Sequence, residues 1–209
     1  MSDYADQEAL DLLKKWWREY GKIALVAILI GLAIGFGWRY WRAHQVAQAE
    51  RASLIYQQAQ WALTQQRWSE AEALWKSLMK QYAQTPYASL AAGFLAQRDV
   101  SQNRLAAAVS DLQWVIQHAR SASVKQIARL RGARVLLAEA QPQAALVLLK
   151  TVDDPTYQPL IDSVKGDIYR TQGQTALAAA SYAAAQQGFA AHGITDPVFN
   201  LSASSTLTH

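Results

Sequence analysis

The feature that most constrains the fold is a register of small residues that recurs along the chain. It begins at four positions that are 34, 40 and 33 residues apart: Ala59, Gly93, Ala133 and Gly166. Twelve positions after each of these come Ala71, Leu105, Ala145 and Ala178, and all but Leu105 are small. Four positions later again, the residue is large and apolar: Trp75, Val109, Leu149 and Tyr182. A period of about 34 residues is typical of tetratricopeptide repeats, so the register predicts an all-α solenoid of about four helix pairs.

The register also assigns a role to each position. Small residues let paired helices approach closely, and the large residue fills the gap to the neighbouring unit. The fourth unit matches the tetratricopeptide consensus best, at Gly166, Tyr169, Gly173, Ala178, Tyr182 and Ala185. We therefore expect the register positions and Tyr169 to form the packing between helices.

Short breaks separate the predicted helices. Alanine supplies much of the hydrophobic content of 51%, and the chain has only 10 glycines and 5 prolines, which favours helices over strands. We expect the first repeat helix over Ala43–Gln66 and the second over Ser69–Tyr82. Thr85-Pro86 and Asp154-Pro155 each offer an N-cap followed by a first-turn proline. Other breaks are expected at Ser101–Asn103, Arg120–Ser123, Ala140–Gln143 and Thr171–Gln174.

A second constraint is the stretch from Ile23 to Trp38, which carries no charged residue. As a helix it spans about 24 Å, and the hydrocarbon core of a bilayer is about 30 Å thick. The flanking residues suit the interfaces, because Lys22 and Arg39 can snorkel and Trp38 and Trp41 can anchor at headgroup level. The stretch predicts an N-terminal transmembrane helix over residues 23–41, with membrane lipid as its surroundings.

Two other interpretations of this stretch are weaker. A cleaved signal peptide has a short basic start, whereas 22 residues precede this stretch and five of them are acidic. A buried helix of a globular domain is the other alternative, and it is disfavoured because the uncharged run leaves no polar face. We therefore predict that the anchor is retained.

The charges around the anchor predict its orientation. Four basic residues precede it, and three follow it closely: Lys14, Lys15, Arg18 and Lys22, then Arg39, Arg42 and Arg51. Basic residues favour the cytoplasmic side, so residues 1–22 are expected to form a cytoplasmic tail and residues 43–192 a domain on the outer side. The tail is either a short interfacial helix or a solvated segment. Residues 193–209 are rich in Ser and Thr and are expected to be disordered.

Three small residues lie four apart within the predicted span: Ala27, Gly31 and Gly35. Such a spacing gives a nearly flat helix face that a second transmembrane helix can approach closely. The alternative is that these residues are simply frequent in membrane helices.

The sequence offers no pattern for catalysis or for a cofactor. The four histidines are scattered, and there is no cysteine, phosphate-binding loop or metal-ligand spacing. Asp153 and Asp154 precede a proline, where Asp is a good cap. The formal charge of +4 is small and spread out, which argues against a nucleic-acid partner. A basic run on one predicted helix is either a solvated face or a contact for an acidic partner segment: Lys125, Arg129, Arg131 and Arg134.

One family combines these features in the same order. A charged tail, a single span, the stretch GWRYWRAHQVAQAERASLIYQQA (37–59) and the later LRGARVLLAEAQPQAALVLL (130–149) resemble the YfgM family of ancillary SecYEG translocon subunits. The resemblance implies an inner-membrane anchor and a tetratricopeptide-like domain in the periplasm, without catalytic residues. It also implies association with the Sec translocon and with the periplasmic chaperone PpiD, and help for unfolded exported proteins that leave the channel. A scaffold for another envelope or cell-division complex would share every one of these sequence features.

Overall fold

The computed structural model describes the backbone of residues 2–191 and most of the side chains after residue 24. The expected C-terminal tail, residues 193–209, lies outside the described residues. The chain divides into two compact units, residues 1–48 and residues 49–209. We call residues 49–191, the described part of the second unit, the repeat domain.

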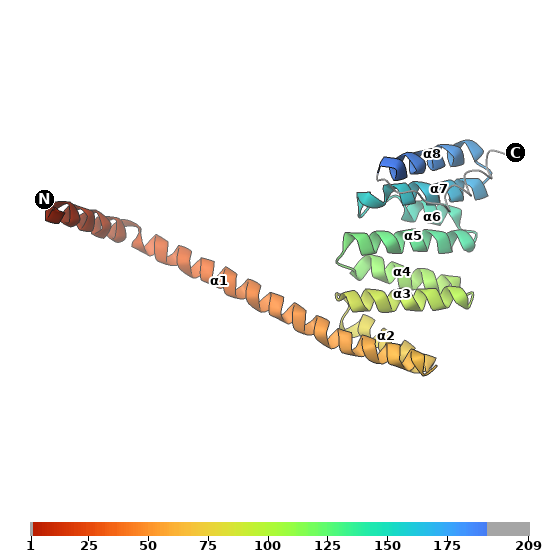
Figure 1. Cartoon of the computed structure of the whole chain (residues 1–209), viewed down its shortest axis with the longest axis horizontal. Helices are drawn as coiled ribbons and strands as arrows, with labels where there is room; N and C mark the ends of the chain where they lie inside the picture. Colours follow the sequence, from red (N-terminus) through yellow and green to blue (C-terminus); the bar gives the residue numbers. More distant parts are fainter. Residues whose placement is uncertain (1, 192–209) are drawn as a thin grey trace. The chain divides into compact units, whose positions relative to one another are not determined.

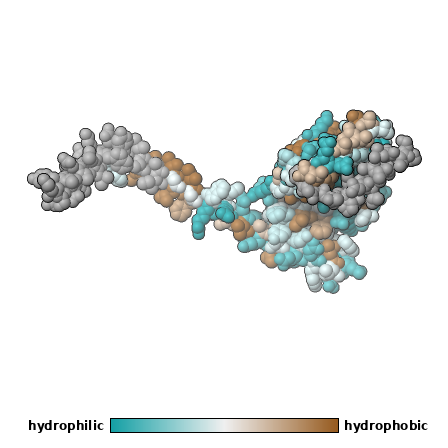
Figure 2. Space-filling model, turned by 45° about the horizontal axis from the view of Figure 1, so that its top comes forward, coloured by the Kyte–Doolittle hydropathy of each residue, from teal (hydrophilic) through white to brown (hydrophobic). Residues whose placement is uncertain are grey.

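The N-terminal unit consists of a single helix, which also continues into the second unit. This helix, α1, runs from Ser2 to Thr64 (Figure 1). The helix predicted over Ala43–Gln66 forms the C-terminal part of this longer helix, which ends at Thr64. The reason is local, because no glycine or proline occurs between Trp38 and Thr64 to interrupt the helix. Large apolar side chains such as Ile34 and Phe36 are exposed on this helix, and Figure 2 shows hydrophobic residues gathered along part of it.

The described part of the repeat domain consists of helices joined by short turns, with no strand, and follows the predicted breaks to within a few residues. Its elements after α1 are α2 (Trp68–Gln81), α3 (Pro86–Ser101), α4 (Leu105–His118), α5 (Ala122–Ala138), α6 (Pro142–Leu148), the 3-10 turn η1 (Pro155–Tyr157), α7 (Gln158–Thr171) and α8 (Thr175–Ala191). Figure 1 shows α3 to α8 stacked one above another. This order of helices makes four helix-turn-helix hairpins when the end of α1 is counted with α2.

The four hairpins share the same turn geometry. Each turn places one residue in the left-handed region, at Gln66 (φ 59), Asn103 (φ 57), Ala140 (φ 57) and Gly173 (φ 72). Only the last is glycine, which adopts this conformation without a steric cost. The left-handed residue reverses the chain after the first helix of each pair, so four different residues produce one repeated turn.

Side-chain caps start two helices and the 3-10 turn. Thr85 Oγ1 accepts a hydrogen bond from the backbone N–H of Ala88 at 3.4 Å, and Pro86 follows in the first turn of α3. Ser121 caps α5 in the same way. Asp154 caps η1 rather than a long helix, and α7 begins only at Gln158. The Thr85-Pro86 prediction is confirmed, and the Asp154-Pro155 start is displaced by one short turn.

Buried alanines let the helices of the repeat domain pack closely. One core cluster joins the end of α1 to α2 and α3: Ala52, Ala59, Ala62, Ala71, Trp75, Leu78, Ala91 and Leu95. A larger cluster extends from α3 to α7, and a smaller one lies along α8. The first helices of successive hairpins also contact each other, α3 with α5 and α5 with α7. These helices therefore form one continuous side of the solenoid.

Candidate interaction surfaces

The apolar stretch of α1 exposes its described side chains. Ile34 is 68% exposed and Phe36 70% exposed. A Cβ built on Gly31 or Gly35 would meet no atom of the described residues outside its own stretch of helix within 4 Å. The side chain of Ala27, the third residue of the expected flat face, lies outside the described residues. Among the described residues, no helix meets the length and apolarity that a membrane span requires.

The expected membrane-anchoring residues fall into two groups. Lys22 and Arg39 are exposed, and the rings of Trp38 and Trp41 lie 5.5 Å apart at an interplanar angle of 42°. The backbone of the basic tail belongs to α1, but the side chains of Lys14, Lys15 and Arg18 lie outside the described residues. The described anchoring side chains all point to solvent rather than into a core.

The expected packing residues occupy several environments in the repeat domain. Seven are buried, with exposures of 4% or less: Ala59, Ala71, Trp75, Ala133, Ala145, Ala178 and Tyr182. Gly166 is buried as well, whereas Gly93 and Tyr169 are half-buried. Trp75 stacks on Phe94 of α3, with ring centroids 5.5 Å apart and planes 8° apart. Leu105, the one large residue at a small position, is half-buried against the main core.

Gly166 of α7 leaves room for an aromatic side chain of the neighbouring helix α8. A Cβ built on it would lie 2.5 Å from Cε1 of Tyr182 on α8. The Tyr182 hydroxyl donates a hydrogen bond to Asp167 Oδ1 at 2.7 Å, which fixes the ring over the glycine. Burial and this hydrogen bond raise the pKa of Tyr182 to about 12, so the hydroxyl remains a donor at neutral pH.

Two tryptophans at the α1–α2 turn are exposed and each lies beside an arginine. Trp61 is 59% exposed and Trp68 is 48% exposed. The Arg67 guanidinium lies 4.4 Å from the centroid of the Trp61 ring, and that of Arg98 lies 5.6 Å from the Trp68 ring. Cation–π contacts of this kind hold the rings in place without covering both faces. Large aromatic side chains that are exposed and pre-positioned are typical of protein-binding hot spots.

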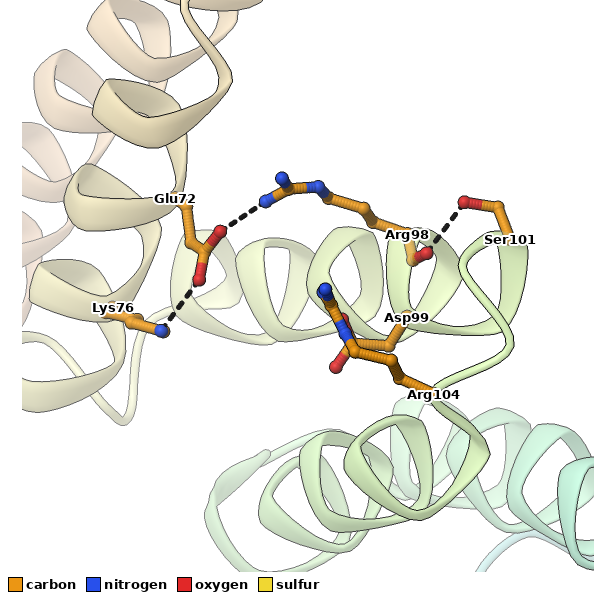
Figure 3. Close-up of polar contacts among 6 residues, drawn as sticks. All are labelled: Glu72, Lys76, Arg98, Asp99, Ser101 and Arg104. Atoms are coloured by element: carbon orange, nitrogen blue, oxygen red, sulfur yellow. Dashed lines mark hydrogen bonds and ion pairs between the residues drawn. The ribbon is translucent and has the colours of Figure 1, made fainter.

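Ion pairs connect the second of these arginines to α2 (Figure 3). The Glu72 carboxylate accepts hydrogen bonds from Lys76 Nζ at 2.7 Å and from the Arg98 guanidinium. The hydrogen bond from Lys76, aided by that from Arg98, lowers the pKa of Glu72. Asp99 pairs with Arg104 at the α3–α4 turn, on the other side of α3 from Arg98. The network joins α2 to α3 and orients Arg98 beside Trp68.

Asp111 on α4 lies in a less favourable environment. Burial, together with the nearby negative charge of Asp99, raises the pKa of Asp111 from 3.8 to about 6. Because the folded state holds this proton more tightly than the unfolded state, the stabilising neutral form is fully present below the unfolded pKa. Its contribution is lost as the pH rises from about 4 through about 6.

We predict that Asp111→Asn makes stability less dependent on pH. At a pH of about 8 the free energy of unfolding of the variant should exceed that of the wild type by on the order of 1 kcal/mol, after allowance for screening by water. At a pH of about 4 the two free energies should be equal. Urea unfolding of the full chain followed by circular dichroism measures both values. Glu50→Gln removes a carboxylate at an exposed position of α1 and is the matched control. An equal gain at both pH values would contradict this interpretation.

The basic run on α5 separates into two groups. Arg129 Nε donates to Asp153 Oδ2 at 2.6 Å, and both side chains are largely buried, so the expectation of a solvated face is wrong for Arg129. The fully buried Gln126 accepts a hydrogen bond from the backbone N–H of Asp153 at 2.9 Å. Together these contacts attach the segment after the short helix α6 to α5. Arg131 and Arg134, by contrast, are exposed.

The segment after α6 also explains the second of the paired aspartates. Ser123 Oγ donates to Asp154 Oδ2 at 2.5 Å, and this bond, with those from Thr156, lowers the pKa of Asp154. Among the described residues there is no group of three or more His, Cys, Asp or Glu side chains that could hold a metal ion. The bonds to Asp153 and Asp154 hold the segment after α6 against α5.

The breaks between the helices were predicted from the sequence, whereas three features of these surfaces were not. The sequence places one tryptophan on each side of the first predicted turn, but it does not indicate that Trp61 and Trp68 are exposed. The Arg129–Asp153 pair joins residues 24 apart in the chain, and no local spacing indicates it. The carboxylate of Asp111 can be recognised as perturbed only once its burial is known.

The chain is similar to a known protein family and to named proteins of several bacteria. A family described as "Tetratricopeptide repeat-like domain" matches residues 14–201. A protein of Escherichia coli (strain K12) is 30% identical over 168 residues, which cover 80% of this chain and 81% of the relative. A protein of Haemophilus influenzae is 28% identical and covers 87% of this chain and 89% of its own length. One of Neisseria gonorrhoeae is 28% identical and covers 85% of both chains. All three relatives are named "Ancillary SecYEG translocon subunit".

Proposed function

Because the chain belongs to the tetratricopeptide repeat-like family of ancillary SecYEG translocon subunits, we propose that it is a membrane-anchored interaction protein of the Sec translocon. Its repeat domain lies in the periplasm, binds a PpiD-like chaperone and assists exported proteins as they leave the channel. It carries out no catalysis and needs no cofactor. The observation that carries this proposal is the pair of exposed tryptophans, Trp61 and Trp68, beside the arginines that position them.

The anchor in this proposal is residues 23–41, preceded by a cytoplasmic tail of residues 1–22. Two observations support it, the exposed apolar side chains of α1 and the aromatic pair Trp38–Trp41 at their end. Lys22 and Arg39 mark the two interfaces, and Ala27, Gly31 and Gly35 form the face for a second transmembrane helix. Small residues on such a face allow a second transmembrane helix to approach closely.

Because the anchor would tether the repeat domain near the channel, a binding surface of low affinity is enough to capture emerging chains. A domain held at the channel exit meets emerging chains at high effective concentration, so weak contacts produce high occupancy. The periplasmic side follows from the charge bias of the flanks, and residues 43–192 form the domain that works there. The role of Trp61 and Trp68 is to contribute aromatic surface at little cost in side-chain entropy.

Site-specific photocrosslinking in intact membranes tests the proposed function. A photoreactive amino acid in place of Trp61 or Trp68 should give crosslinks to Sec subunits or to a PpiD-like chaperone. The same amino acid in place of Leu177, which is 50% exposed on α8, is the matched control for random collisions. If Trp61 and Trp68 gave no such partner, or no more than Leu177 does, the α1–α2 turn would not be the contact surface.

The orientation of the anchor yields a separate prediction. Replacing Lys14, Lys15 and Arg18 by Gln should give a mixed population of chains, because the basic excess that retains the tail in the cytoplasm is lost. Protease accessibility of the repeat domain in spheroplasts measures the two orientations. Replacing Lys76, Lys80 and Lys150 by Gln instead removes the same charge far from the anchor and should leave the orientation unchanged. Full accessibility in the tail variant would show that these basic residues do not set the topology.

A further inference from the structure

The exposed face of α5 carries two arginines that the repeat domain does not neutralise. Arg131 and Arg134 are exposed, and no described carboxylate oxygen lies within 4.0 Å of either guanidinium. Five other arginines of the domain are paired with carboxylates: Arg67 with Glu70, Arg98 with Glu72, Arg104 with Asp99, Arg129 with Asp153 and Arg170 with Asp167. Within the described residues, the positive charge of Arg131 and Arg134 is therefore available to an external anion.

Arg131 lies beside an open position on the neighbouring helix α3. The nearest atom to a Cβ built on Gly93 is Nη1 of Arg131, at 4.0 Å. Leu90 and Gln97, three residues before and four residues after Gly93, belong to the same face of α3 and are exposed. The Tyr182 ring closes the space beside Gly166. Beside Gly93, the contact found within 4 Å among the described residues of other helices is the tip of the flexible Arg131 side chain.

We propose that Leu90 and Gly93 of α3, with Arg131 and Arg134 of α5, bind an acidic segment of a partner protein. Two like charges three residues apart on a helix repel each other, and an anionic ligand relieves this repulsion. A guanidinium group matches a carboxylate in two parallel hydrogen bonds, so acidic side chains are the preferred ligands. The missing side chain at Gly93 lets a ligand backbone approach α3, and Leu90 offers an apolar contact beside it.

A polypeptide fits this surface better than a membrane does. Between Ser123 and Ala138 of α5, only Arg131, Arg134 and Ala138 itself are exposed. An interfacial helix needs a row of large apolar side chains to insert beside its basic residues, and this face of α5 has none. The inference rests on the proposed function, because it assigns a chemistry to one partner of the repeat domain. It uses a different surface from Trp61 and Trp68.

Fluorescence anisotropy with the full chain in detergent micelles tests this proposal. The probe is a fluorescein-labelled peptide in which Glu alternates with Gly and Ser, and the neutral probe carries Gln in place of Glu. We expect the wild type to bind the Glu peptide about tenfold tighter than the Gln peptide at low salt, and less tightly as salt rises. The double variant Arg131→Gln/Arg134→Gln should lose about tenfold in affinity for the Glu peptide.

Further variants distinguish a specific binding site from non-specific electrostatic attraction. Arg51→Gln/Lys80→Gln removes two exposed charges elsewhere and should bind the Glu peptide like the wild type. Gly93→Glu places a carboxylate beside Arg131. It should weaken binding more than Gly93→Gln, which adds a neutral side chain of the same shape as Glu. The proposal is overturned if Arg131→Gln/Arg134→Gln binds like the wild type, or if both double variants lose affinity equally. Arginine-dependent binding of vesicles of anionic phospholipid without binding of the Glu peptide would overturn it as well.

Crosslinking from Trp61 and Trp68 in the double variant distinguishes this proposal from the proposed function. Loss of Glu-peptide binding with these crosslinks retained supports an acidic-segment site that is separate from the tryptophan surface. If the double variant still binds the Glu peptide, with or without these crosslinks, the acidic-segment site is contradicted and the proposed function is not.

Discussion

Replacing Trp75 by Ala is expected to lower the free energy of unfolding of the repeat domain by about 3 to 5 kcal/mol. The side chain is 1% exposed and lies in the cluster that joins α1, α2 and α3. Its ring stacks on Phe94, so the substitution removes a contact between two hairpins and leaves a cavity that neighbouring alanines are too short to fill. Urea unfolding of the full chain, followed by circular dichroism, measures the loss.

Two controls show whether the loss arises from burial. Trp75→Phe keeps the aromatic packing and removes an indole N–H that has no acceptor within the described residues, so it should cost less than about 2 kcal/mol. Trp61→Ala and Trp68→Ala remove tryptophans that are 59% and 48% exposed and should cost about 1 kcal/mol or less. A loss for Trp75→Ala as small as that for Trp61→Ala would show that Trp75 does not hold the first two hairpins together.

The second large effect is expected at Gly166, where Gly166→Val should destabilise the domain by about 3 kcal/mol. An added Cβ would lie 2.5 Å from the Tyr182 ring, and the ring cannot shift freely because its hydroxyl is bonded to Asp167. The helices α7 and α8 would have to separate, which would disturb the small cluster of Ala178, Ala185 and Phe189 along α8. Thermal unfolding monitored by circular dichroism gives the size of the effect.

Gly93 provides the matched position for this experiment. It belongs to the same register as Gly166, but an added Cβ there would meet only Arg131 Nη1 at 4.0 Å. Gly93→Ala should therefore be neutral or stabilise the helix by up to about 1 kcal/mol, because alanine is the better helix former. Equal losses at the two glycines would mean that the register, rather than the Tyr182 contact, determines the cost.

Much of the fold could be predicted from the sequence because it depends on local signals. The breaks at Thr85-Pro86 and at Ser101–Asn103 coincide with the start and the end of α3. The left-handed turn residues were harder to foresee, since glycine marks only Gly173 while Gln66, Asn103 and Ala140 adopt the same conformation. In each turn the backbone N–H of the next residue donates to the carbonyl oxygen five residues earlier, a helix-ending motif that places the intervening residue in the left-handed region.

The surfaces depend on residues that are distant in the chain, and this is why the sequence predicted them less well. Arg129, Arg131 and Arg134 belong to one basic run in the sequence, but among the described residues only Arg129 meets a carboxylate, because the segment after α6 places Asp153 against α5. Similarly, Gly93 and Gly166 occupy equivalent register positions, and only the second lies under an aromatic ring. Such differences arise from the packing of particular neighbours rather than from periodicity.

The most direct test of the central claim, that this repeat domain holds other proteins at the Sec translocon, is an affinity purification. The full chain, carrying an affinity tag, would be extracted from membranes in a mild detergent, and the proteins that co-elute would be identified by mass spectrometry. We predict that Sec subunits and a PpiD-like chaperone co-elute with the wild type, and that Trp61→Ala/Trp68→Ala reduces their recovery. Elution of the wild-type chain without any Sec or chaperone partner would contradict the claim.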